Sequence, residues 1–174
     1  YREDGKIRFS ENALQRDANL FSYTHYDEIG RPVESGEYVG NLIYFVKMDH
    51  AAFSTSDMQG ELEKVYKDVA WGESDRTDWV ITYYDATPSG GIPLPLQQEF
   101  IRGAVASTEN ANNQTWYSYD EFGRVKWMLQ QPKSVDITTL LRYSYDFSGN
   151  VLQVENATYR SGTLTAQFFH HYEY

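Results

Sequence analysis

The chain has 174 residues, of which 41% are hydrophobic and 23% charged, a balance typical of a folded domain rather than a disordered segment. Its formal net charge of −10 would repel a phosphate backbone, so nucleic acid is not an expected partner. The sequence has no cysteine, which excludes disulfides and thiolate chemistry, and it has no apolar run long enough for a membrane-spanning helix. Its 15 Tyr, 9 Phe and 4 Trp residues favour β structure.

One short pattern recurs: a Tyr-Asp pair, two variable residues, a Gly, a polar or basic residue and an apolar residue. The clearest copies are "YDEIGRP" from Tyr26, "YDEFGRV" from Tyr119 and "YDFSGNV" from Tyr145. Apolar and polar residues alternate around the copies, which is the pattern of a β-hairpin. The Asp side chain is expected to accept hydrogen bonds from backbone amides two residues on, and the Gly to supply a positive φ. Each copy therefore predicts a hairpin turn.

Taken in chain order, six copies are expected. The first starts at Tyr1 and the second at Tyr26, while the weaker third copy at Tyr84 follows after 58 residues. The fourth and fifth start at Tyr119 and Tyr145, and Tyr174 opens another. The residues predicted to build these turns are Tyr1, Gly5, Tyr26, Asp27, Gly30, Arg31, Tyr84, Asp85, Tyr119, Asp120, Gly123, Arg124, Tyr145, Asp146, Gly149 and Tyr174.

The predicted fold class is all-β, with successive antiparallel β-hairpins forming a continuous twisted sheet over residues 1–174 as one domain, because a single hairpin cannot bury its own apolar face. Two segments depart from the pattern. An irregular insert is expected over about 40–78, with a short amphipathic helix near 58–70. The segment 87–95 contains three prolines and two adjacent glycines, and is expected to be an exposed loop that replaces the turn of the copy at Tyr84.

Each residue that could serve in catalysis or ligand binding can also be explained by a purely structural role. Asp27, Asp120 and Asp146 recur at one repeat position, whereas a catalytic residue is needed once, so they are interpreted as turn residues. His170 and His171 are adjacent and would point to opposite faces of a strand, which disfavours a shared metal ion. We therefore expect no catalytic residue, metal or cofactor, and no enzyme. Trp71, Trp79, Trp116 and Trp127 could stack on sugar rings in an exposed groove, although the favoured interpretation is that most of them fill the buried face of the sheet.

The repeated motif resembles the YD repeat of the Rhs family, which includes bacterial polymorphic toxins, shell-forming subunits of insecticidal toxin complexes and animal teneurins. Tyr26, Asp27, Gly30 and Arg31 match the motif fully, as do the residues from Tyr119 to Val125. The copy at Tyr145 has Asn150 in the Arg position, and the copy at Tyr1 has Arg2 in the Asp position. The resemblance covers the chain apart from about residues 40–78 and 86–105. It implies a sheet of hairpins that spirals into a hollow shell around a C-terminal toxin-like domain.

On this resemblance the chain is expected to be a wall segment of a bacterial Rhs-repeat protein, secreted or displayed at the cell envelope, with both of its ends cut from a longer protein. Its partners would be the remaining repeats and the C-terminal domain. The alternative is a cell-surface module that binds carbohydrate or a partner protein through exposed aromatic side chains. An isolated fragment is expected to self-associate edge to edge through 166–174 or the N-terminal strand, because open strand edges seek partners. The 40–78 segment could instead cover those edges.

Overall fold

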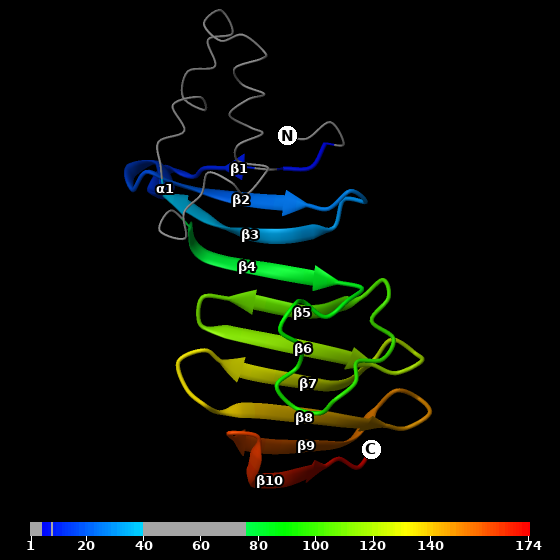
Figure 1. The fold of residues 1–174 in the computed structure, drawn as a ribbon. Helices are drawn as coiled ribbons and strands as arrows, with labels where there is room; N and C mark the ends of the chain where they lie inside the picture. The colour runs from blue at the N-terminus through cyan, green and yellow to red at the C-terminus, as the bar shows by residue number, and fades with distance from the viewer. Residues whose placement is uncertain (1–4, 8, 40–75) are drawn as a thin grey trace, which may run out of the picture. The chain divides into compact units, whose positions relative to one another are not determined.

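The computed structural model describes residues 5–7, 9–39 and 76–174. Within these residues there are ten strands, labelled in Figure 1, which are antiparallel and follow one another in chain order, so the predicted all-β fold class is confirmed. The helix expected near 58–70 and nearly all of the expected insert over 40–78 lie outside the described residues. In the part of the chain that is described, no helix is long and apolar enough to cross a membrane.

The chain forms two compact units, residues 1–79 and 80–174. The strands are β1 (Phe9–Ser10), β2 (Leu20–Tyr26), β3 (Pro32–Val39), β4 (Arg76–Tyr84), β5 (Val105–Asn110), β6 (Asn113–Tyr119), β7 (Val125–Pro132), β8 (Thr138–Tyr145), β9 (Val151–Arg160) and β10 (Thr163–His171). Among the described residues there is one short helix, α1 (Ala13–Asp17), which connects β1 to β2.

In the first unit, α1 begins with a capping box that the repeat pattern did not predict. The Asn12 side chain accepts from the Gln15 amide at 2.9 Å, and the Gln15 side chain accepts from the Asn12 amide at 3.0 Å. This reciprocal bonding satisfies two amides that would otherwise lack partners at the helix start. Gln15 is buried and also donates to Ser22 and Glu37, so the helix is fixed onto β2 and β3.

The core of the first unit is an aromatic cluster on β2. Phe21 and Tyr23 are buried, and Phe9 and Tyr38 pack against them. The Tyr23 hydroxyl donates to Glu34 at 2.6 Å, and Arg76 also bonds to that carboxylate at 2.8 Å. The buried Glu34 is therefore both hydrogen-bonded and paired with a cation, as a buried charge requires.

The second unit has a straight apolar row across four strands. Trp116 lies opposite Leu129, Leu129 opposite Leu140, and Leu140 opposite Ala157. All four are at most 2% exposed. Since side chains opposite one another on paired strands share a face, the register places these residues in one continuous core.

Most of the connection between β4 and β5, residues 86–102, is here called the strap, and it lies over this core (Figure 1). Its sequence "IPLPL" alternates: Leu94 is buried, Ile92 and Leu96 pack against the core, and Pro93 and Pro95 are exposed. A residue before proline favours an extended backbone, so Ile92, Leu94 and Leu96 face the same side. Residues 87–95 form a loop that is exposed over 89–91 and at both of these prolines, as expected, but the expectation of exposure is wrong for Ile92 and Leu94, whose side chains pack on the sheet.

Polar contacts fix the end of the strap to the strands below it. Nε2 of the Gln98 side chain donates to the carbonyls of Ala106 and Tyr117 at 2.6 and 2.7 Å. The Glu99 amide donates to the Ser118 hydroxyl at 2.9 Å, and the Glu99 carbonyl accepts from the Tyr119 amide at 3.0 Å. The strap thus behaves as part of the folded unit.

We predict that Leu94→Ala lowers the free energy of unfolding by roughly 2–4 kcal/mol, because it removes a buried side chain from the contact between strap and sheet. Urea denaturation measures the change. Phe147→Ala is the matched control, since Phe147 is fully exposed and its removal should change stability by less than about 0.5 kcal/mol. Equal, small effects of both substitutions would show that the strap does not contribute to the core.

Candidate functional site

The candidate site is the repeated turn, and its hydrogen bonding is clearest between β6 and β7. Asp120 Oδ1 accepts from the amides of Phe122 at 3.0 Å and Arg124 at 2.9 Å. Asp120 Oδ2 accepts from Arg124 Nε at 2.6 Å. Burial disfavours the charged form of this carboxyl, but the hydrogen bonds from Arg124 and Phe122 outweigh burial and hold the pKa of Asp120 below its ordinary value.

The turn between β2 and β3 repeats this arrangement atom for atom. Asp27 Oδ1 accepts from the amides of Ile29 and Arg31 at 3.1 and 2.7 Å, and Oδ2 accepts from Arg31 Nε at 2.7 Å. Between β8 and β9, Asn150 replaces the arginine, and its amide and side chain both donate to Asp146 at 2.8 Å. Burial opposes ionisation of Asp27, yet the bonds from Arg31 lower its pKa, and the Asn150 side chain lowers the pKa of Asp146.

The glycines of these three turns have left-handed backbones. Their φ angles are +83° at Gly30, +76° at Gly123 and +92° at Gly149. Each glycine amide also donates to the backbone carbonyl of the Asp at 3.0–3.1 Å. The expected turn geometry, with Asp capping the amide two residues on and Gly at positive φ, is therefore present at Asp27 and Asp120, and the glycine geometry is present at all three.

The copy at Tyr84 keeps the same closure across a much longer connection. Tyr84 pairs with Val105 as Tyr119 pairs with Val125, with the same register shift next to it. Gly103 has a φ of +79° and its amide donates to Asp85 Oδ1 at 2.6 Å. Gly103 and Val105 therefore occupy the Gly and apolar positions of the motif. As expected, a longer loop stands here in place of the tight turn, although Asp85 still bonds to Gly103 and Ala104 at the base of the loop.

The motif tyrosine joins consecutive copies. The hydroxyl of Tyr145 donates to the carbonyl of Val125 at 2.7 Å, that of Tyr119 to Val105 at 2.9 Å, and that of Tyr26 to Ile7 at 2.9 Å. Each acceptor is the apolar residue that ends the preceding motif. Burial raises the pKa of Tyr119 and of Tyr145, which keeps these hydroxyls protonated as donors.

The basic residue of one copy also contacts the tyrosine of the next. The Arg124 guanidinium lies 4.4 Å from the centre of the Tyr145 ring, and Arg124 donates to the Asp146 carbonyl at 3.2 Å. Lys6 lies 5.3 Å from the centre of the Tyr26 ring. Cation–π contacts of this kind stabilise a pair by about 0.5–1 kcal/mol at exposed sites. The motif did not predict this link, since its spacing does not say which copy the basic side chain faces.

Two predicted motif positions lie at the ends of the chain. Tyr1 lies outside the described residues, whereas Gly5 has the expected positive φ of +79°. At the other end, β10 pairs with β9 so that His171 lies opposite Gln153. The Tyr172 amide donates to the Leu152 carbonyl at 3.0 Å, and Tyr174 is exposed beyond the end of β10.

Of the tryptophans considered as sugar-binding platforms, the two in the second unit do not lie on an open surface. Trp116 is 2% exposed and Trp127 is 5% exposed, and both belong to the core under the strap. Trp79 is half-buried and lies against Gly36, while Trp71 is outside the described residues. Trp116 and Trp127 therefore fill the buried face, in agreement with the favoured interpretation of these rings.

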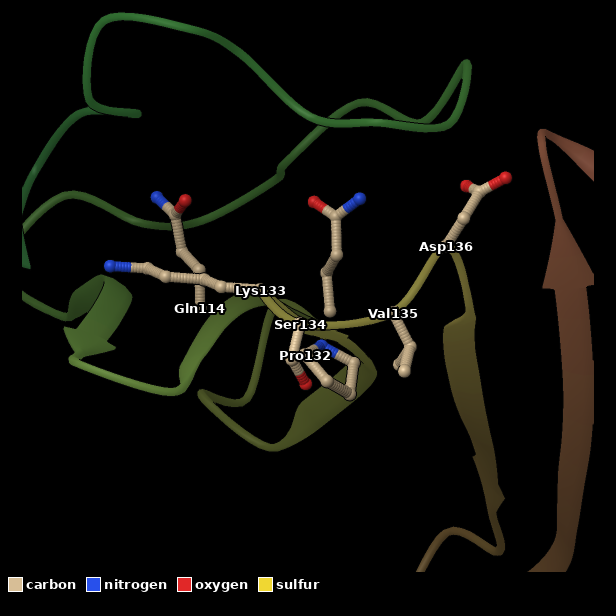
Figure 2. A pocket seen from close by; sticks show the side chains of 7 residues that line it. Gln114, Pro132, Lys133, Ser134, Val135 and Asp136 are labelled. Carbon is tan, nitrogen blue, oxygen red and sulfur yellow. The ribbon is translucent and has the colours of Figure 1, made fainter.

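Two of the depressions on the surface of the second unit bear on a possible ligand. One, of about 440 Å³, is lined by the connection from β7 to β8 and by residues of β6 and β7 (Figure 2). Its charged side chains are used internally, because Lys133 donates to Glu109 at 2.7 Å and Asp136 accepts from Ser161. The other, of about 340 Å³, lies beside the turn at Asp120. Among the described residues, no group of three or more His, Asp or Glu side chains could hold a metal ion.

We predict that Gly123→Ala destabilises the protein by about 1–2 kcal/mol, because an L-residue with a β-carbon disfavours a left-handed backbone. No atom lies within 4 Å of a β-carbon built on Gly123, so the loss is conformational rather than steric. Gly123→Asn is the matched control and should cost less, since Asn tolerates this conformation. Thermal melts would compare the variants, and an unchanged melting temperature for the alanine variant would contradict the turn assignment.

We predict that Asp120→Asn lowers the melting temperature at pH 7 and that the difference from the wild type narrows at pH 2.5. The folded pKa of Asp120 lies below its ordinary value of 3.8, so its stabilising contribution is present above that value and is lost as pH falls through the folded pKa. Glu121→Gln removes the same charge from an exposed neighbour and serves as the control. A difference that is the same at both pH values would refute the role of the ionised carboxylate.

Comparison of the chain with protein-family models gives no match, and comparison with curated proteins gives none either. The resemblance to YD repeats therefore depends on residues within the chain. What the geometry adds is that these residues make the same contacts in successive copies.

Proposed function

We propose that the chain is a structural wall segment of a bacterial Rhs-type repeat protein, in which stacked hairpins enclose or present a C-terminal, toxin-like domain outside the cell or at its envelope. Its partners would be the neighbouring repeats and that domain. The proposal assigns no catalytic residue and no cofactor. Function would reside in the continuous sheet and in what the sheet encloses.

The observation that carries the proposal is the constancy of the junction between copies. Three motif tyrosines donate to the same position of the preceding motif, over intervals of different length and across the inserted strap. Repeats that contact only their neighbours, through one conserved junction, can be added in number without a change of design. A structure that can be lengthened in this way is suited to form the wall of a shell.

The alternative, a binding module that uses exposed tryptophans, has less support. Trp116 and Trp127 are covered by the strap, so they offer no open face to a sugar ring. A binding role would need other residues.

The wall architecture predicts that one whole period can be duplicated. Inserting a second copy of residues 120–145 after Tyr145 preserves every turn and every tyrosine junction, so we expect a folded protein with an unchanged or higher melting temperature and the same β content by circular dichroism. The matched control inserts only residues 120–132, which adds a single strand and reverses the direction of all that follow. A duplicated variant no more stable than this control would refute the repeat-wall interpretation.

Enclosure is tested on the whole protein that carries these residues. We expect the domain following the repeats to resist limited proteolysis while the repeats are intact, and to become cleavable when Gly123 and Gly149 are both replaced by valine. A domain cleaved at the same rate in both proteins would contradict enclosure. In the isolated chain, β10, whose residues are all exposed, should instead pair with a second copy, and light scattering on Phe169→Lys measures whether that association is lost.

A further inference from the structure

The pairing between β5 and β6 stops short of the repeated turn that follows β6. Its last pair on that side is Ser107 and Trp116. At the next position, Nε2 of Gln98 from the strap donates to a carbonyl of each strand, that of Ala106 at 2.6 Å and that of Tyr117 at 2.7 Å. A side chain of the strap therefore satisfies two carbonyls that the strands do not satisfy by pairing with each other.

The strap backbone completes this contact one residue further on. The Glu99 amide donates to the Ser118 hydroxyl at 2.9 Å, and the Tyr119 amide donates to the Glu99 carbonyl at 3.0 Å. Ser118 is 0% exposed beneath it. The two carbonyls, the Ser118 hydroxyl and the Tyr119 amide thus bind two consecutive residues of the strap, and these four groups are here called the anchor site.

The same four groups recur at the next junction, between β7 and β8. The sequence Tyr-Ser-Tyr-Asp occurs at 117–120 and again at 143–146. The β7–β8 pairing ends at Trp127 and Arg142, three residues before the motif tyrosine of β8, just as the β5–β6 pairing ends three residues before that of β6. The groups equivalent to the anchor site are the carbonyls of Lys126 and Tyr143, the Ser144 hydroxyl and the Tyr145 amide.

At this second junction the equivalent groups lie at an open depression. Ser144 is exposed, whereas its equivalent Ser118 is completely buried. The depression of about 340 Å³ is lined by Lys126, Tyr143, Ser144 and Tyr145, together with residues of the strap and of the β6–β7 turn. The chain therefore shows at one junction which kind of segment an anchor site binds, and at the next it carries the same groups on its surface.

The surface beside the two sites differs, and this difference indicates what an occupant of the second site would carry. Trp116 and Leu129, which pack beneath the strap, correspond to Arg142 and Glu155 at the second junction. These two charged side chains pair with each other at 3.1 Å. The apolar side chains of the strap would gain little there, so a suitable segment is polar on either side of its anchoring residues.

We propose that this depression is a docking site for an extended, polar segment of a partner protein that carries a glutamine. The glutamine side chain would bridge the carbonyls of Lys126 and Tyr143. The residue after it would bond through its backbone to Ser144 and Tyr145, as the strap does at the anchor site. The inference goes beyond the wall function and is independent of it, because it depends only on contacts within the second unit.

The test is NMR titration of the isotope-labelled full chain with a capped peptide, serine–glutamine–glutamine–glutamate–serine, at millimolar concentration. This peptide carries residues 97–99 of the strap between polar ends. We expect saturable shifts of the Ser144 and Tyr145 amide signals and slower hydrogen exchange of the Tyr145 amide. The Tyr119 amide should not respond, because it is already bonded to Glu99.

Ser144→Ala should weaken binding by about fivefold, the loss expected for one hydrogen bond. Ser148→Ala is the matched control, since Ser148 is an exposed serine of the same hairpin that does not line the depression, and its affinity for the peptide should equal that of the wild type. A peptide with leucine in place of the second glutamine should bind more weakly than the parent peptide.

The proposal is overturned if the peptide causes no saturable shift, or if the leucine peptide binds as tightly as the parent. Equal weakening by Ser144→Ala and Ser148→Ala would also overturn it. Shifts at the Tyr119 amide in place of the Tyr145 amide would mean that the peptide displaces the strap from its own anchor site, and would likewise refute a second site.

Discussion

The hydrogen bond from a motif tyrosine to a carbonyl of the preceding copy, made by Tyr26, Tyr119 and Tyr145, is the constraint on which the arrangement of hairpins depends. A turn fixes only its own two strands, whereas this bond fixes the next hairpin against the last one. Its acceptor is the residue where the strand leaves the turn, next to the register shift, so the bond sets where the following strand must end. A side chain as long as tyrosine is needed, because it must cross from one strand to its neighbour. The ring then becomes the surface on which Arg124 stacks, so one residue provides two links.

The aspartate and glycine have the complementary task of closing the turn. A carboxylate that accepts two amides and an arginine side chain satisfies backbone groups that would otherwise face water at the tip. Its lowered pKa is a consequence of that bonding and does not by itself indicate chemistry. The repeated Tyr-Asp pair is thus explained by architecture: tyrosine joins copies, and aspartate closes each copy.

Much of the structure of the repeated turns could be predicted from the sequence, because a turn depends on residues that are close together in the chain. Asp120 and Gly123 act within five residues of each other, and the alternation of apolar and polar residues around them indicates β-strands. What could not be predicted depends on contacts between distant residues. The direction in which Arg124 faces depends on the neighbouring hairpin, and the burial of Leu94 depends on a core that lies on other strands. The alternation in "IPLPL" was a usable signal for the strap, but its prolines pointed to a loop and concealed it.

The strap shows how far the turn tolerates insertion. Asp85 and Gly103 are separated by 18 residues, whereas Asp120 and Gly123 are separated by 3, yet both pairs of strands enter the sheet in the same register. Loop closure alone is a weak obstacle, since each doubling of loop length costs only about 0.6 kcal/mol. Ordering the inserted residues costs far more, which explains why the strap carries three inward apolar side chains and the anchors at Gln98 and Glu99. These anchors also bring Phe100 to the next repeat junction, so the insertion that covers one face of the sheet creates a new surface at its turns.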